Sequence, residues 1–348
     1  MKKSLMKFKW PALIVSAVLA GSVIFISSCG QTLSPSASAG PVTVVVTSTP
    51  GAPTATITAT PTPLPGTGAS WTTHQIPTVL TSWSAIAYGN GVFVAVNGSN
   101  SVAAAVSSDG ITWTGSLLPS NENWTSVIYA NGLFVAVASS SAVAATSPDG
   151  INWTGRSLPS TKAWVSVAYG NGVFVAVSNN NSAVATSPDG ITWTAHNSGL
   201  TDQWNWVSYG NGVFVAIAVG TTGEMVSTDR ITWTSHGMPF SADWMAMTYA
   251  NGLFVAVNED DMANATSPDG ITWSSPTAAG SGTPAYHAVA YGNGLFVAAG
   301  SGSSAVETSP DGINWTGHTI PITNTIAMTY GNGKFVALGA NGAVATSP

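Results

Sequence analysis

The sequence predicts an all-β fold, a seven-bladed β-propeller of four-stranded blades whose ring is closed by an N-terminal outer strand. The motif Tyr-Gly/Ala-Asn-Gly-x-Phe-Val-Ala occurs seven times, and its Phe residues follow one another at intervals of 39 to 42 residues. A second motif, Ser-x-Asp-Gly-Ile-Thr/Asn-Trp, follows each of the first six copies, with Arg in place of Gly in the fourth. A repeat of about 40 residues has the period of a propeller blade.

Each repeat divides into four short strands, here called A to D in chain order. In the second repeat, Asn131-Gly132 supplies the two positive φ angles of a tight hairpin turn, and Pro148-Asp149-Gly150 supplies a second turn. The strand between these turns that is apolar on both faces is expected to be covered on both sides. The four predicted strands are Trp124–Ala130, Leu133–Ala138, Ala142–Ser147 and Ile151–Ser157.

The two chain ends predict how the ring closes. The chain stops at Ser347-Pro348, where the turn between strands C and D begins, so the last repeat lacks strand D. The segment Trp71-Thr72-Thr73-His74 matches the Trp-Thr-x-x that begins strand D in other repeats. We therefore expect residues 71–348 to form the propeller, with this segment as the outer strand of the last blade and no inner sheet edge left unpaired.

The N-terminus has the pattern of an export signal. Four lysines precede an apolar run over residues 12–26, which ends in Ile26-Ser27-Ser28-Cys29. This tetrapeptide resembles the bacterial lipobox. The resemblance implies removal of residues 1–28 and a diacylated Cys29 that anchors the protein to the bacterial cell membrane on the extracytoplasmic side. An ordinary signal peptide with a chance Cys is the alternative. Residues 29–70, rich in Ser, Thr and Pro, are expected to form an extended linker.

Composition excludes several classes of partner. Only 6% of residues are charged, and after residue 28 four basic side chains remain against fourteen acidic ones, a formal net charge of −10. Such a surface does not suit nucleic-acid binding, which needs clustered Lys and Arg. Cys29 is the only cysteine, so no disulfide forms within the chain. We expect a monomer without cofactor.

The second motif resembles the Asp-box, or BNR, repeat of sialidase-like propellers, and the repeat as a whole is similar to WD40/YVTN-like blades. The copies here are one residue shorter between Asp and Trp than the family pattern. The resemblance implies that the boxes are structural turns, and Asp carboxylates commonly cap backbone N–H groups in such turns. It assigns a folding role to Asp109, Asp149, Asp189, Asp229, Asp269 and Asp311.

A sialidase-like glycoside hydrolase is the alternative function. That family clamps its substrate with three arginines, whereas only Arg156 and Arg230 follow residue 28, and neither is expected at the channel mouth. We assign no catalytic residue and no metal site. The run Glu259-Asp260-Asp261 could supply oxygen ligands to Ca²⁺, with a solvated acidic cluster as the alternative.

A binding function is the expectation that remains. Six of the seven blades begin strand A with a large aromatic residue on the face that carries the B–C and D–A loops, here called the top face. Partly exposed rings there would suit a glycan or protein ligand. The alternative is that the rings pack between blades and serve the fold. These candidate ligand-binding residues are Trp83, Trp124, Trp164, Trp204, Trp244 and Tyr286.

Overall fold

The computed structural model describes residues 70–77, 82–260, 264–275 and 285–347, together with the backbone of two short strands nearer the N-terminus. The chain divides into two compact units, residues 1–63 and 64–348. In the first unit, β1 (Thr43–Val45) pairs antiparallel with β2 (Thr56–Thr58), so part of the expected linker forms a short strand pair. The export signal and Cys29 lie outside the described residues. In the part that is described, no helix is long and apolar enough to cross a membrane.

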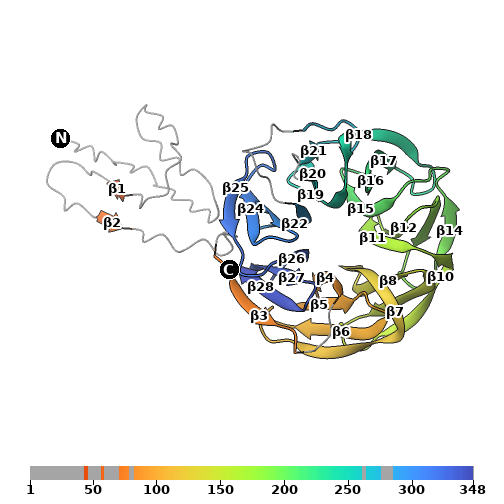
Figure 1. The fold of residues 1–348 in the computed structure, drawn as a ribbon, viewed down its shortest axis with the longest axis horizontal. Coiled ribbons are helices and arrows are strands. Elements are labelled where there is room, and N and C mark those ends of the chain that lie inside the picture. Colours follow the sequence, from red (N-terminus) through yellow and green to blue (C-terminus); the bar gives the residue numbers. More distant parts are fainter. Residues whose placement is uncertain are drawn as a thin grey trace, which may run out of the picture. The chain divides into compact units, whose positions relative to one another are not determined.

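The second unit is the predicted seven-bladed propeller, a ring of twisted antiparallel sheets around a central axis (Figure 1). Its third to sixth blades, each in the order A to D as far as described, consist of β11 (Trp164–Gly170), β12 (Val173–Ser178), β13 (Ala183–Ser187) and β14 (Thr194–Asn197); β15 (Trp204–Gly210), β16 (Val213–Ala218), β17 (Thr221–Ser227) and β18 (Thr234–Ala242); β19 (Trp244–Ala250), β20 (Leu253–Asn258) and β21 (Ala265–Ser267); and β22 (Tyr286–Gly292), β23 (Leu295–Gly300), β24 (Ala305–Ser309) and β25 (Thr316–Thr319).

The first two blades are joined by one continuous strand. β7 (Thr114–Ala130) pairs with β6 (Ser101–Ser107) of blade 1 through its first half and with β8 (Leu133–Ser139) of blade 2 through its second half. It therefore serves as strand D of one blade and strand A of the next. The remaining strands of these blades are β4 (Trp83–Gly89), β5 (Val92–Asn97), β9 (Ser141–Ser147) and β10 (Thr154–Lys162).

The ring closes as the chain ends predict. Blade 7 consists of β26 (Thr325–Gly331), β27 (Lys334–Gly339), β28 (Ala343–Ser347) and, as its outer strand, β3 (Thr72–Gln75). Pairing runs from Thr346 opposite Thr72 to Ala343 opposite Gln75. In Figure 1 the orange β3 lies beside the blue β28, so segments from the two ends of the domain share one sheet.

The A–B and C–D turns share the face opposite the top face, here called the bottom face. In every A–B turn an Asn and the following Gly both have positive φ, for example 50° at Asn131 and 80° at Gly132, as the Asn-Gly signal predicts. The side-chain amide of Asn90 donates to the carbonyl of Pro148, which joins an A–B turn to the C–D turn of the next blade. The turns thus link blades as well as strands.

Each Asp-box carboxylate organises the turn in which it lies. Oδ1 of Asp149 accepts hydrogen bonds from the backbone N–H groups of Ile151 and Asn152, at 2.9 and 2.8 Å, and from the hydroxyl of Ser147. The hydrogen bond from Asn152 is the main cause of the lowered pKa of Asp149. Since residues 151–153 belong to this turn, strand D begins at Thr154 and not at Ile151 as the sequence predicted.

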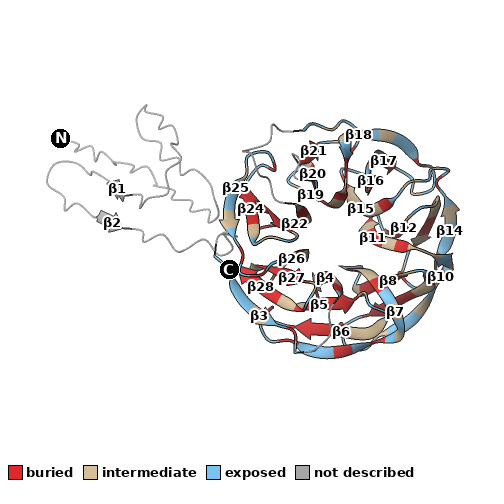
Figure 2. Cartoon of the chain, in the orientation of Figure 1, coloured by how far each residue is buried: buried red, intermediate tan, exposed pale blue. Residues whose placement is uncertain are grey.

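The core lies between the blades and not within a single sheet. Strand B is buried along nearly its whole length in each blade, and Figure 2 shows burial concentrated on the inner strands while the outer strands are exposed. Six of the seven interfaces join apolar side chains of one blade to the aromatic residue that begins strand A of the next, as where Val94 and Val96 meet Trp124, and the blade 7 strand begins with Thr325 instead. Stability therefore depends on neighbouring blades, as in other repeat folds.

Candidate binding channel

A β-bulge at the start of every strand A decides which side chains face the channel. The first residue of strand A pairs with the end of strand B, the second residue is skipped, and the third resumes the pairing, as in Trp124, Thr125 and Ser126. The same shift occurs in the other six blades. A bulge changes the direction in which neighbouring side chains point. It turns the first residue into the blade interface and leaves the second partly exposed.

The six aromatic residues expected as ligand platforms are buried. At most 3% of the surface of Trp83, Trp124, Trp164, Trp204, Trp244 or Tyr286 is accessible. The indole Nε1 of Trp124 donates to the carbonyl of Ser101 in blade 1, at 3.1 Å. The expectation of partly exposed rings is therefore wrong, and the burial agrees with the alternative in which these rings pack between blades.

The strand A tyrosines are more accessible than these rings, and two of them, Tyr88 and Tyr129, line the central channel. The Tyr one residue before the end of each strand A is partly exposed, and its ring packs on the Phe of strand B, with ring centroids 4.6 to 4.8 Å apart. The ring of Tyr129 also lies so close to Gly89 of the preceding blade that a Cβ at Gly89 would overlap it. These tyrosines belong to the first repeat motif. Because they recur with the same spacing as the buried Phe and Trp residues, the sequence does not distinguish them from aromatic residues of the core.

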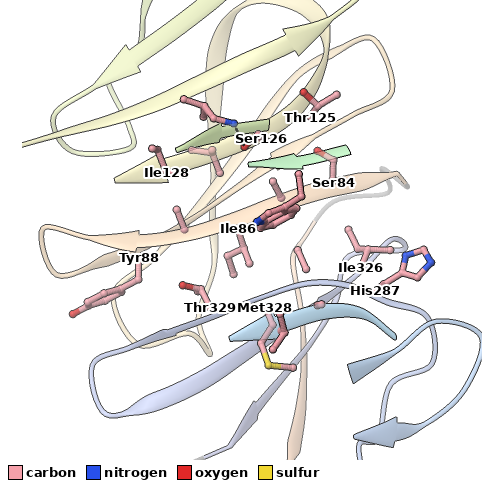
Figure 3. Close-up of a pocket in the computed structure, with 18 of the residues that line it drawn as sticks. Ser84, Ile86, Tyr88, Thr125, Ser126, Ile128, His287, Ile326, Met328 and Thr329 are labelled. Carbon is pink, nitrogen blue, oxygen red and sulfur yellow. Dashed lines mark hydrogen bonds between the residues drawn. The ribbon is translucent and has the colours of Figure 1, made fainter. Parts of the chain in front are cut away.

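A cavity of about 270 Å³ occupies the channel. Strand A residues of six blades line it, and Figure 3 shows its side chains from β4, β7, β22 and β26. Most are apolar, including Ile86, Ile128, Val167, Ile326 and Met328. Among the described residues that line it there is no Asp, Glu, Lys or Arg.

Several polar groups in the lining are already hydrogen-bonded to the next blade. The hydroxyl of Ser84 donates to the carbonyl of Trp124 at 2.6 Å, and the hydroxyl of Thr125 donates to that of Trp164 at 2.9 Å. The hydroxyl of Ser126 accepts the backbone N–H of Val167. These groups hold blades together, so the chemistry left for a ligand is mainly apolar.

Trp206 breaks the repeat at the channel wall. Its position after the bulge is occupied in the other six blades by a small residue: Ala85, Ser126, Ser166, Ala246, Ala288 or Ala327. The indole is partly exposed, lines the cavity, and packs against the apolar clusters on both sides of blade 5. Comparing the repeats position by position, and not by their shared motif, would have found this residue in the sequence.

His287 also lines the cavity. It occupies the bulge position of blade 6, and its Nε2 lies 2.8 Å from Oε2 of Glu259 in the B–C loop of blade 5. The side chains of His287 and Glu259 are 18% and 40% exposed, respectively. The pair therefore places a polar, partly solvated contact beside an apolar hollow.

The acidic run does not gather into a metal site within the described residues. Oδ2 of Asp260 accepts the backbone N–H of Asp243, Glu259 contacts His287, and Asp261 lies outside the described residues. No group of three His, Cys, Asp or Glu side chains in the described part could hold a metal ion. The two arginines are remote from the channel lining: Nε of Arg156 donates to Thr146, and that of Arg230 to the carbonyl of Asp229.

Glu224 is a buried carboxyl group between blades 4 and 5. Its place in strand C is taken by Val184 in blade 3 and by Val344 in blade 7, which pair with strand B in the same register. Neither carboxyl oxygen makes a hydrogen bond of good geometry, and the Trp273 indole supplies only a weak contact. Burial raises the pKa of Glu224 to about 8, the Trp273 indole opposes this rise, and the Asp269 carboxylate adds to it. The group is therefore largely protonated at neutral pH.

Replacing Glu224 with Val should remove a pH-dependent cost of folding. The folded-state pKa lies above the ordinary value of 4.5, so the folded state keeps a proton that the unfolded state loses between about pH 4.5 and 8. The free energy of unfolding must then fall as pH rises through that window. Glu224→Val should exceed the native protein in stability by more at pH 9 than at pH 5 in urea denaturation. Parallel pH profiles for the two proteins would contradict this assignment.

Comparison with known proteins supports the architecture. Residues 69–205 match the family model described as the DUF6242 beta propeller domain. No curated protein matches the chain. Among solved structures, catalytically inactive virginiamycin B lyase from Staphylococcus aureus with quinupristin has a TM-score of 0.71 at 10% identity, covering 80% of this chain and 98% of its own.

Two structures of YCF48 are also similar. YCF48 bound to D1 peptide has a TM-score of 0.65 at 19% identity, and the match covers 83% of this chain and 99% of the YCF48 chain. YCF48 from Cyanidioschyzon merolae has a TM-score of 0.61 at 17% identity, over 80% and 98%. At these identities the similarity concerns the fold alone. The protein is a β-propeller, and the solved structures similar to it are not specifically of the sialidase type.

Proposed function

We propose that the protein is a lipid-anchored, extracytoplasmic binding module that receives an apolar side chain of a polypeptide partner in its central channel. The observation that carries this proposal is the apolar cavity with Trp206 in its wall. The hydroxyls of Ser84 and Thr125 in the lining already donate hydrogen bonds to the next blade, so the surface that remains for a ligand is mainly apolar. Large aromatic side chains in a concave site are typical anchors of protein recognition. The peptide complex of the similar YCF48 propeller gives this choice a structural parallel.

A protein ligand suits the cavity better than the glycan ligand that the top-face aromatic residues suggested. Those rings are buried and cannot stack on a sugar. The cavity offers mainly aliphatic surface, together with the Trp206 indole and the His287–Glu259 pair. Burial of apolar area is the chief gain available to a ligand there.

Anchoring rests on the sequence around Cys29. The apolar run that ends at the only cysteine gives the protein a lipid attachment point, and the Ser/Thr/Pro-rich segment that follows gives the propeller reach from the membrane. Cys29→Ser should release the protein from the membrane fraction. Unchanged retention of that variant would remove the lipid anchor from the proposal.

The binding proposal is tested by screening the full-length chain against an array of random peptides. Peptides that bind should share an apolar or aromatic anchor residue. Ala85→Trp, which places in blade 1 the residue that blade 4 already carries at the equivalent position, should fill the cavity and abolish binding. Trp206→Ala should weaken binding about 30-fold, equivalent to about 2 kcal/mol, the loss expected for an interface anchor.

A matched substitution separates the channel from the outer surface. Thr161 is exposed near the end of β10, the outer strand of blade 2, and is absent from the cavity lining, so Thr161→Arg should leave peptide binding unchanged. Peptides that bind equally well to the Ala85→Trp variant, with both variants folded by circular dichroism, would place the binding site elsewhere and overturn the proposal.

A further inference from the structure

Two hollows of about 560 and 520 Å³ lie side by side where blades 6 and 7 meet, and they share Pro321 and Thr323. The first is also lined by residues 73–75 of β3 and by Asn341. The second is also lined by Trp71 and by Ser304. None of these residues lines the channel cavity, so the two hollows form a separate feature, here called the closure groove.

The closure groove lies at a short connection between the blades. Pro321 lies only four positions before Thr325, the residue that begins strand A of blade 7. In three other connections the proline lies five residues before the strand A Trp: Pro119 and Trp124, Pro159 and Trp164, and Pro239 and Trp244. Thr325 is smaller than Trp, and Ile320 and Ile322 are turned into the core. The two hollows lie beside this shorter connection and share Pro321.

The closure groove is polar but carries no formal charge. Its lining contains no Asp, Glu, Lys or Arg. Burial lowers the pKa of His74, so the imidazole is neutral at pH 7. The hydroxyls and amides that line it can donate and accept hydrogen bonds, and they belong to Ser70, Thr73, Gln75, Ser304, Thr319, Thr323 and Asn341. Gln75 Nε2 already donates to the carbonyl of Asn341, and Asn341 Oδ1 accepts the backbone N–H of Ala343, so Gln75 Oε1 and Asn341 Nδ2 are the amide atoms left for a ligand.

Apolar surface is present beside these polar groups. Trp71 is partly exposed, as are the equivalent Trp153, Trp273 and Trp315 of blades 2, 5 and 6, and Pro321 beside it is exposed. A sugar presents both hydroxyl groups and an apolar C–H face, and it is recognised by flat aromatic surface beside hydrogen-bonding groups. A charged saccharide would find no counter-ion in the closure groove.

We infer that the closure groove is a binding site for a neutral oligosaccharide, with Trp71 and Pro321 against the sugar faces and Gln75, Thr323 and Asn341 against the hydroxyls. The observations that carry it are the paired hollows, their uncharged polar lining and the partly exposed Trp71 beside the exposed Pro321. It is independent of the channel, since the two sites have no lining residue in common.

Isothermal titration calorimetry of the full-length chain tests this inference. The ligands are three neutral hexasaccharides, maltohexaose, cellohexaose and chitohexaose, and the anionic hexagalacturonate. At least one neutral hexasaccharide should bind, and anionic hexagalacturonate should not. Thr323→Arg should lower the affinity for the bound saccharide at least about tenfold, or 1.4 kcal/mol, by filling and charging the groove. Thr161→Arg, two residues after Pro159 as Thr323 is after Pro321, is the matched control and should bind normally.

Three results would overturn the closure groove as a saccharide site. The first is that none of the three neutral saccharides binds. The second is that hexagalacturonate binds as tightly as the neutral saccharides. The third is that Thr323→Arg binds the saccharide with the same affinity as the Thr161→Arg control. Trp206→Ala distinguishes the sites, because it should affect peptide binding and leave saccharide binding unchanged. Circular dichroism verifies that the arginine variants are folded, since Thr323 and Thr161 are both exposed.

Discussion

Deletion of residues 71–77 should open the ring, with a large drop in melting temperature and self-association of the protein. The deletion removes β3, whose four residues pair with β28, and it removes Ile76, which is fully buried and donates its backbone N–H to Gly342. It also removes the contact between His74 and the hydroxyl of Thr346. The edge of Ala343–Ser347 would then be unpaired, and exposed strand edges template pairing with other chains.

Thermal melts and light scattering measure this effect. A synthetic peptide of residues 71–77 added in trans should recover part of the lost melting temperature, because the register of β28 with β3 is set by backbone pairing that a free strand can supply. A deleted protein that melts at the native temperature and stays monomeric would show that the N-terminal strand is not what closes the ring.

Trp124→Ala should cost about 3–5 kcal/mol of folding stability, the range for removal of a large aromatic side chain from a core. The Trp124 ring is fully buried between blades 1 and 2, and its indole donates to Ser101. Trp164 and Trp204 occupy equivalent places, so the same loss is expected at each. Chemical denaturation of the three single variants measures the effect.

Trp206→Ala provides the internal comparison for these variants. Trp206 is partly exposed at the channel wall, and six of seven blades manage with a small residue there, so its removal should cost much less stability than removal of Trp124. Small losses at Trp124, Trp164 and Trp204 would contradict the core role of these residues and return them to consideration as ligand contacts.

The fold could be predicted from the sequence because its determinants are local and repeated. The Asn-Gly pairs, such as Asn131-Gly132, favour hairpin turns wherever they occur, and the Asp-box residues, such as Asp149, carry their own hydrogen-bond acceptors. Seven similar units that each bury strand B between neighbours have few other ways to pack. The displaced Trp71 segment then predicted which strand completes blade 7.

The candidate binding site could not be predicted in the same way. The sequence shows an aromatic residue at the start of strand A but not the β-bulge after it, and a shift of one residue exchanges the faces of a strand. That bulge buries Trp124 and leaves its neighbour Thr125 partly exposed in the channel lining. The repeat motifs do not predict Trp206 either, because it lies outside both motifs, at a position where the other six blades have a small residue.

The sequence by itself thus determined the number of blades, their strand order and the closure of the ring, because repeat spacing and turn chemistry act over a few residues. Only the tertiary structure decided which side chains face the channel, since that depends on a bulge and on the contact of one blade with the next. It also decided that Glu224 is buried without a hydrogen bond of good geometry and that a groove lies beside Pro321. Both features arise from packing between segments that the repeat pattern treats as equivalent.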